Sequence, residues 1–94
     1  MDKLDKLLLS HKIYPDLKGY IFIKDILHNI NKPIAFLNIT DVYKESAIRY
    51  NTDCSTIERN IRTVFSLSDL SGLYNKRGLA LLQLEYKGEN KDEV

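Results

Sequence analysis

The sequence lacks most features of secreted, disulfide-stabilised or membrane-embedded proteins. It contains a single cysteine, Cys54, so no intramolecular disulfide can form, whereas small domains from oxidising compartments usually need several. No apolar run approaches the ~18–20 residues of a membrane span. The N-terminus has no hydrophobic segment of signal-peptide length. These absences predict a cytoplasmic protein that contacts no membrane.

Turn-forming residues and alternating runs of β-branched residues are also scarce, although leucine and isoleucine are abundant. The chain has four glycines, two prolines and three valines, with no tryptophan, which favours helices over strands. Its 94 residues are enough for one domain with a slim core. A deep cofactor pocket would consume much of that core, so the length argues against an enzyme built around an enclosed site.

Neither sign of charge dominates, because 14 basic side chains face 13 acidic ones. This balance excludes a histone-like protein and an acidic tail protein. Residues 38–65 carry four basic and four acidic side chains. Since phosphate attraction supplies most non-specific affinity, a single copy is expected to bind nucleic acid weakly. Further basic residues would strengthen binding if the fold gathers them: Lys12, Lys18, Lys76 and Arg77.

The spacing of apolar residues predicts an all-α fold, a compact bundle of about six helices. One domain is expected over residues 1–86, followed by a polar disordered tail at 87–94. Leu79, Leu81 and Gln83 alternate as in a strand, so helix and strand both remain open for the last element. The expected helices cover residues 2–11, 17–31, 34–37, the segment from Asn38 or Thr40 to Tyr50, 54–67 and 79–86.

Two of these helices are separated by the short turn 51–53, which is the spacing of a helix-turn-helix. Ala47 is small at the position where two such helices cross most closely. Asn51 tolerates the left-handed conformation that often ends a helix, and Asp53 is suited to cap the next one. Thr52 departs from the pattern, because such motifs often have an apolar residue there.

The helix at 54–67 has two chemically different sides. Its inward stripe consists of Ile57, Ile61, Val64 and Phe65. The opposite side carries Ser55, Thr56, Arg59, Arg62 and Thr63, with Glu58 on the flank. Arginine matches the O6 and N7 atoms of guanine, and hydroxyls contact phosphates, so this side is suited to the major groove of DNA.

The same residues also have ordinary structural explanations. Exposed arginines are often simply solvated, and Glu58 has the i,i+4 spacing for an ion pair with Arg62. Ser55 and Glu58 have the spacing of a capping box, in which Glu58 would serve only the helix start. The pattern by itself therefore leaves nucleic-acid binding and a solvated face both open.

No other constellation indicates chemistry. The two histidines, His11 and His28, and Cys54 lack the spacing of a zinc site, and His11 is expected to close the first helix. Gly72 and Gly78 are isolated, so no phosphate-cradling loop exists. The expectation is a protein that is not an enzyme, with no cofactor, no metal and no small-molecule substrate.

Residues 47–62 resemble the helix-turn-helix of the C-terminal effector domain of the stage-zero sporulation protein A family. That family carries a similar Ala, then Asn-Thr, then Ser-x-Val-Glu-Arg-x-Ile-Arg. The segments 10–13 and 18–20 (Lys-Gly-Tyr) are also similar to the family. The resemblance covers residues 11–65, beyond which this chain is shorter than the family and matches it poorly.

The resemblance implies an all-helical domain of about six helices that binds specific promoter DNA through the helix at 54–67. It also implies pairing of two copies on repeated sites. The family's recognition positions fall on Ser55, Glu58, Arg59 and Arg62. The chain departs from the family at Thr56, where arginine is usual, at Thr63, where histidine is frequent, and at Lys44, which replaces a proline.

The 94 residues include no receiver domain of the kind that such response regulators carry, and no aspartate is assigned as a phosphoacceptor. Met1 and the polar tail favour a stand-alone relative over an excised domain. The alternative function is a protein–protein interaction module that modulates another regulator.

Overall fold

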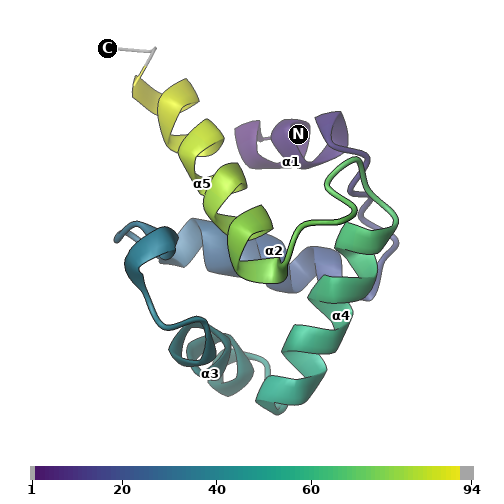
Figure 1. Cartoon of the computed structure of the whole chain (residues 1–94), viewed down its shortest axis with the longest axis vertical. Coiled ribbons are helices and arrows are strands. Elements are labelled where there is room, and N and C mark those ends of the chain that lie inside the picture. The colour runs from purple at the N-terminus through teal and green to yellow at the C-terminus, as the bar shows by residue number, and fades with distance from the viewer. Residues whose placement is uncertain (1, 92–94) are drawn as a thin grey trace.

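The computed structural model describes residues 2–91, and all regular secondary structure in this part of the chain is helical (Figure 1). It contains five α-helices rather than the expected six, because the segment predicted at 34–37 is a single 3-10 turn. None of the described helices is both long and apolar enough to cross a bilayer. The elements are α1 (Lys3–Ser10), α2 (Lys18–Asn29), η1 (Ile34–Phe36), α3 (Ile39–Arg49), α4 (Cys54–Ser66) and α5 (Asn75–Lys91).

The last element is a helix and is longer than the sequence predicted. Leu79, Leu82 and Gln83 are buried at the i, i+3, i+4 spacing of one helix face, whereas Leu81 and Leu84 are exposed. The strand-like alternation therefore had no structural meaning. Residues 87–91, expected in a disordered tail, continue α5 as helix, and residues 92–94 lie outside the described residues.

Helix α2 crosses the middle of the molecule and contacts α3, α4 and α5. In Figure 1 it runs behind α5, with α1 above it, α3 below it and α4 at the right. Its side chains Ile23 and Ile26 are completely buried. The core is thus built around α2, and the other helices pack on its sides.

The crossing of α2 and α4 requires a glycine. A Cβ atom added at Gly19 would lie 2.3 Å from the backbone oxygen of Asn60 and 2.6 Å from Cγ2 of Val64. Real side chains never approach backbone oxygens this closely, so any other residue would push the two helices apart. The glycine of the Lys-Gly-Tyr segment therefore allows α4 to pack closely against α2.

A buried glutamine holds the connection between α2 and α3. Gln83 is 2% exposed, and its Oε1 accepts a hydrogen bond from the backbone N–H of Ile34 at 2.7 Å. Its Nε2 donates to the backbone oxygen of Lys32 at 2.8 Å. These bonds satisfy backbone groups of the connection between α2 and α3, which accounts for a polar side chain in the core.

His11 closes α1, as predicted, and it also joins two distant segments. Its Nδ1 lies 2.8 Å from Oδ1 of Asp69 in the α4–α5 loop, and its Nε2 lies 2.6 Å from Oε2 of Glu85 in α5. Burial lowers the pKa of His11, but the hydrogen bonds to Glu85 and Asp69 outweigh burial and raise the pKa above 6.5. The protonated ring donates to both carboxylates at once.

Candidate nucleic-acid interface

The turn between α3 and α4 has the left-handed residue that the sequence predicted. Asn51 has a φ of 52°, and its N–H donates to the carbonyl of Ile48 at 3.3 Å. The N–H of Thr52 donates to the carbonyl of Ala47 at 2.9 Å. This pair of bonds is a Schellman motif, which stops α3 and turns the chain sharply into α4.

Asp53 is the N-cap of α4, as predicted. Its side chain accepts a hydrogen bond from the backbone N–H of Thr56 at 2.8 Å, and this bond holds the pKa of Asp53 below its usual value. Because Asp53 is the cap, Ser55 lies inside the first turn and does not form a capping box with Glu58. That structural explanation of Glu58 is wrong.

The inner side of α4 is the apolar stripe that the sequence predicted. Its four members are at most 2% exposed: Ile57, Ile61, Val64 and Phe65. This burial fixes the rotation of α4 about its axis, since any other rotation would expose the stripe to water.

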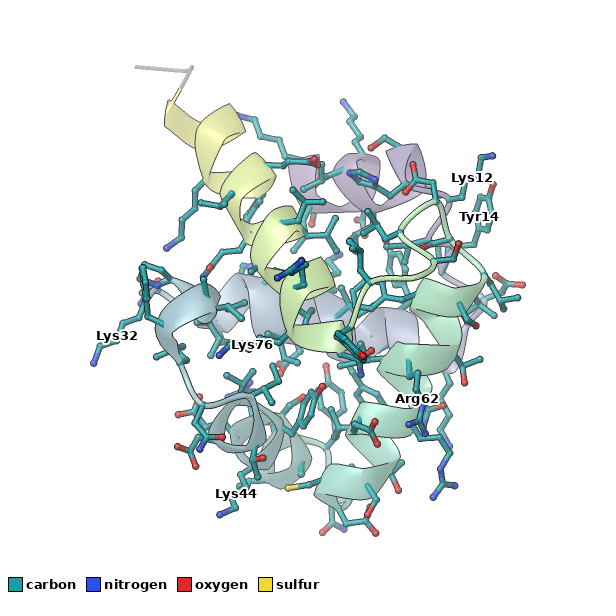
Figure 2. All side chains as sticks on the ribbon, in the orientation of Figure 1. Lys12, Tyr14, Lys32, Lys44, Arg62 and Lys76 are labelled. Carbon is teal, nitrogen blue, oxygen red and sulfur yellow. The ribbon has the colours of Figure 1, made fainter. Side chains whose placement is uncertain are left out.

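The fixed rotation carries the six predicted site residues to the outer side of α4 and to its edges. Ser55, Arg59 and Thr63 are exposed, and the side chain of Arg62 is 63% exposed (Figure 2). Thr56 and Glu58 are half-buried at the two edges of this side. We call Ser55, Arg59 and Thr63 the crest of α4.

The two arginines differ in their surroundings. Nη1 of Arg62 lies 3.0 Å from Oε1 of Glu58, which is the i,i+4 ion pair anticipated from the sequence. Arg59 makes no ion pair within the described part of the chain. Of the two arginines, Arg59 is therefore the one whose guanidinium is available to bind a ligand, and it lies on the crest.

Asn75 contacts both helices of this unit, and sequence reasoning missed it. Its Nδ2 donates to Oη of Tyr43 on α3 at 3.1 Å and to the backbone oxygen of Glu58 on α4 at 3.0 Å. The burial of the phenol is also the main reason that the pKa of Tyr43 is raised. A lone asparagine before a helix expected to start at residue 79 carries no periodic signal, so only the tertiary structure identifies it.

Two of the four additional basic residues named from the sequence lie beside α4. Lys18 lines a cleft together with Thr56, and Lys76 lines another together with Arg62. The fold therefore gathers part of the positive charge that the local sequence lacks. The other two residues, Lys12 and Arg77, line neither cleft.

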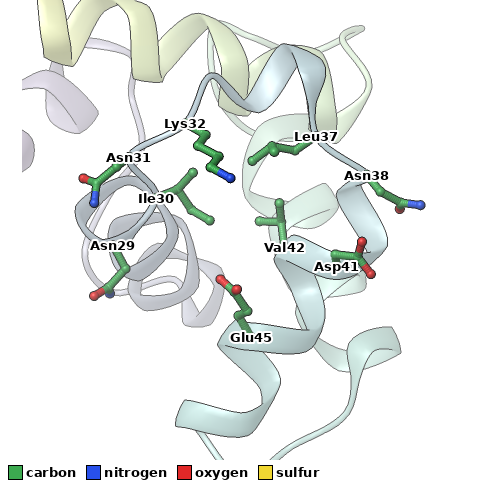
Figure 3. A pocket seen from close by; sticks show the side chains of 9 residues that line it. All are labelled: Asn29, Ile30, Asn31, Lys32, Leu37, Asn38, Asp41, Val42 and Glu45. Carbon is green, nitrogen blue, oxygen red and sulfur yellow. The ribbon is translucent and has the colours of Figure 1, made fainter.

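A third cleft of about 350 Å³, between the end of α2 and the start of α3, has a different character (Figure 3). Asp41 and Glu45 lie one turn apart on its rim, and it contains none of the six predicted residues. Its carboxylates would repel phosphate. Among the described residues, no group of three or more His, Cys, Asp or Glu side chains is arranged to hold a metal ion.

The fold and this surface define an all-α domain whose helices α3 and α4 are consistent with a helix-turn-helix. Residues 4–87 match the family model described as "Sporulation initiation factor Spo0A C terminal". The chain belongs to this family, whose domain is the DNA-binding effector domain of a sporulation regulator and not an enzyme. Comparisons with curated proteins and with solved structures found no match.

The family match also corrects the extent of the resemblance. The sequence indicated similarity only to about residue 65, whereas the match continues to residue 87. Helix α5 is therefore part of the family's domain up to that residue. The residues after Phe65 contain no recognisable motif of the family, so the sequence pattern alone does not indicate this longer match.

Proposed function

We propose that this chain is a sequence-specific DNA-binding domain of a transcription regulator, with α4 lying in the major groove at promoter sites. One observation carries the proposal: a helix fixed by a fully buried apolar stripe presents an uncommitted arginine between two hydroxyls. Residues on an exposed helix face of this kind reach base edges in the major groove. The family to which the chain belongs supports the same function.

In this proposal the six residues have different roles. Arg59 reads guanine, because its planar fork matches O6 and N7. Ser55 and Thr63 contact phosphates or base edges on either side of it. Arg62 contacts a base or a phosphate after its ion pair with Glu58 breaks. The released carboxylate of Glu58 is then able to accept a hydrogen bond from the amino group of cytosine. Thr56 lies at the edge of this surface, where the family usually has arginine.

We further propose that two copies bind neighbouring repeated sites. A domain of net charge +1 has little electrostatic attraction for a duplex. Two copies bound side by side would make twice as many contacts with the same DNA. A protein that binds promoters must reach the chromosome, and this agrees with the expected location in the cytoplasm.

The test begins with selection of bound sequences from a random pool of duplex DNA. Binding of the selected duplex is then measured by fluorescence anisotropy over a range of salt concentrations. We expect affinity to fall steeply with salt, and the double substitution Arg59→Ala/Arg62→Ala to abolish the preference for the selected sequence. A chain that selects no sequence and binds no duplex at low salt would contradict the proposal.

The second candidate function is a protein–protein interaction module. Phe36 and Tyr74 favour it, because each is 87% exposed and large exposed aromatic residues are frequent in protein interfaces. The same titration separates the two functions. A module of this kind would form a stable complex with a partner regulator while showing no salt-dependent DNA binding.

A further inference from the structure

Two lysines from different helices lie beside α4. Lys18 is the first residue of α2 and lines a cleft of about 300 Å³ together with Thr56. Lys76 is the second residue of α5 and lines a cleft of about 500 Å³ together with Glu58 and Arg62. The two lysines are 58 positions apart in the sequence, and only the fold brings both to α4.

The two clefts lie on opposite edges of the crest. Successive residues of an α-helix are rotated by about 100°, so Thr56 and Glu58 lie about 200° apart through buried Ile57 and about 160° apart across the exposed side of α4. Arg59 lies between them on the exposed side. One lysine therefore flanks the crest at the Thr56 edge and the other at the Glu58 edge. Both stand beside the N-terminal half of α4, the half that contacts base edges in helix-turn-helix proteins.

Both lysines are free to bind an external anion. Neither forms an ion pair within the described residues. Two other lysines of the chain are committed: Nζ of Lys24 lies 2.9 Å from Oδ1 of Asp5, and Nζ of Lys87 donates to the backbone oxygen of Asn31 at 2.6 Å. Within residues 2–91, Lys18 and Lys76 have no such partner.

The arrangement matches the chemistry of a DNA groove. The major groove is about 12 Å wide and is bordered on each side by a row of phosphates from one strand. A helix inserted between the two rows meets negative charge at both of its edges. We propose that Lys18 and Lys76 form a two-sided phosphate clamp, in which each lysine binds the backbone of one strand while α4 lies between them.

The clamp rests on the proposed function and assigns positioning and sequence discrimination to different residues. Contacts with phosphates set the position of a protein on DNA but carry no sequence information, whereas contacts with base edges specify the sequence. The two lysines orient α4, and Arg59 on the crest discriminates between sites. The clamp also explains how a domain with equal numbers of acidic and basic residues in its helix-turn-helix segment binds a polyanion.

The test compares salt dependences among matched charge changes. Lys18→Gln and Lys76→Gln each remove one cation from an edge of α4, and Lys32→Gln is the control, because Lys32 is exposed in the α2–η1 connection on the far side from Arg62 (Figure 2). Binding is measured for the selected duplex and for an unrelated duplex. Each clamp variant should reduce the slope of log affinity against log salt by about 0.9, and the double variant by about twice as much.

The clamp variants should lose affinity by the same factor on both duplexes, whereas Arg59→Ala should lose affinity mainly on the selected one. Thermal unfolding should be unchanged in all of them. A wild-type slope in either clamp variant overturns the two-sided clamp, as does a loss confined to the selected duplex. If the unmodified chain binds no duplex at low salt, the proposed function fails together with the clamp. If it binds and responds to Arg59→Ala alone, only the clamp fails.

Discussion

The inner and outer sides of α4 belong to the same 13-residue helix but are under opposite constraints. On the inner side four apolar residues are at most 2% exposed, and α2 approaches so closely that only glycine fits at position 19. On the outer side Arg59 has no ion-pair partner within the described residues, and Arg62 is paired only within its own helix. Stability and ligand binding are therefore carried by separate residues of one element.

This separation can be tested by substitutions on each side. A change on the inner side should lower the free energy of unfolding, and it should weaken DNA binding only to the extent that the chain unfolds. A change on the outer side should weaken DNA binding and leave the free energy of unfolding within about 0.5 kcal/mol of its original value.

The largest effect is expected for Gly19→Ala. The added methyl group would lie 2.3 Å from the backbone oxygen of Asn60, so α2 and α4 must separate. We expect a loss of about 3 kcal/mol in the free energy of unfolding, measured by urea denaturation. Gly88→Ala is the matched control, because nothing lies within 4 Å of a Cβ at that position. Equal stabilities of the two variants would show that the α2–α4 crossing is looser than described.

Next in size is the effect of Arg59→Ala on binding. Removal of this guanidinium should cost about 1–3 kcal/mol of affinity for the selected duplex and leave urea denaturation unchanged. Arg62→Ala should cost affinity in the same range. Anisotropy titrations at one fixed salt concentration measure both. If either variant unfolds more readily than the unmodified chain, the outer side is not independent of the fold.

A smaller and pH-dependent effect is expected for His11→Gln. The pKa of His11 is raised in the folded state, so its contribution to stability is fully present below pH 6.5 and is lost as the pH rises through the folded-state pKa. The variant should lose about 1 kcal/mol in acid, where hydrogen bonds to Asp69 and Glu85 are charge-assisted, and less in alkali. The comparison variant is His28→Gln, since His28 is exposed.

Urea denaturation at pH values on both sides of 6.5 measures this difference. A loss that grows with increasing pH, or one that His28→Gln reproduces, would contradict the assigned role of His11. DNA binding at a fixed pH below 6.5 should be unaffected, because both partners of the ring, Asp69 and Glu85, lie outside α4.

The smallest effect is expected for Glu58→Gln, at the edge between the two sides. The change keeps the size of the side chain and releases Arg62 from its 3.0 Å ion pair. Exposed pairs are worth at most about 1 kcal/mol, so affinity for duplex DNA should rise by about fivefold or less. Glu45→Gln on α3 is the control, because it is exposed and removes the same charge. A fall in affinity for the selected duplex would instead indicate that the contact of Glu58 with cytosine outweighs the release of Arg62.

Local features of the site were predictable from the sequence because they depend on neighbours in the chain. The left-handed Asn51, the cap at Asp53 and the Glu58–Arg62 pair each involve residues within a few positions of one another. The apolar stripe of α4 was predictable for the same reason, since a period of 3.6 residues defines a face before any partner is known. The membership of the family was also recognisable, because its motif lies within one short segment.

Features that join distant segments could not be predicted in this way. No pattern indicates that Gly19 meets Asn60, that Asn75 holds both α3 and α4, or that Gln83 satisfies backbone groups near Ile34. The last helix was predicted too short, because residues 75–78 and 87–91 are polar or glycine and add no apolar periodicity to the segment between them. The capping box failed because Ser55 and Asp53 are both acceptable caps, and the geometry of the turn selected Asp53.

The sequence by itself determined the helical class, the position of the turn and the polar character of one side of α4, since these follow from local spacing and side-chain chemistry. The tertiary structure decided how closely α4 seats on α2, which arginine is uncommitted, and which lysines lie at its edges. These depend on contacts between residues far apart in the chain, and such contacts exist only after the apolar stripes have been buried against one another.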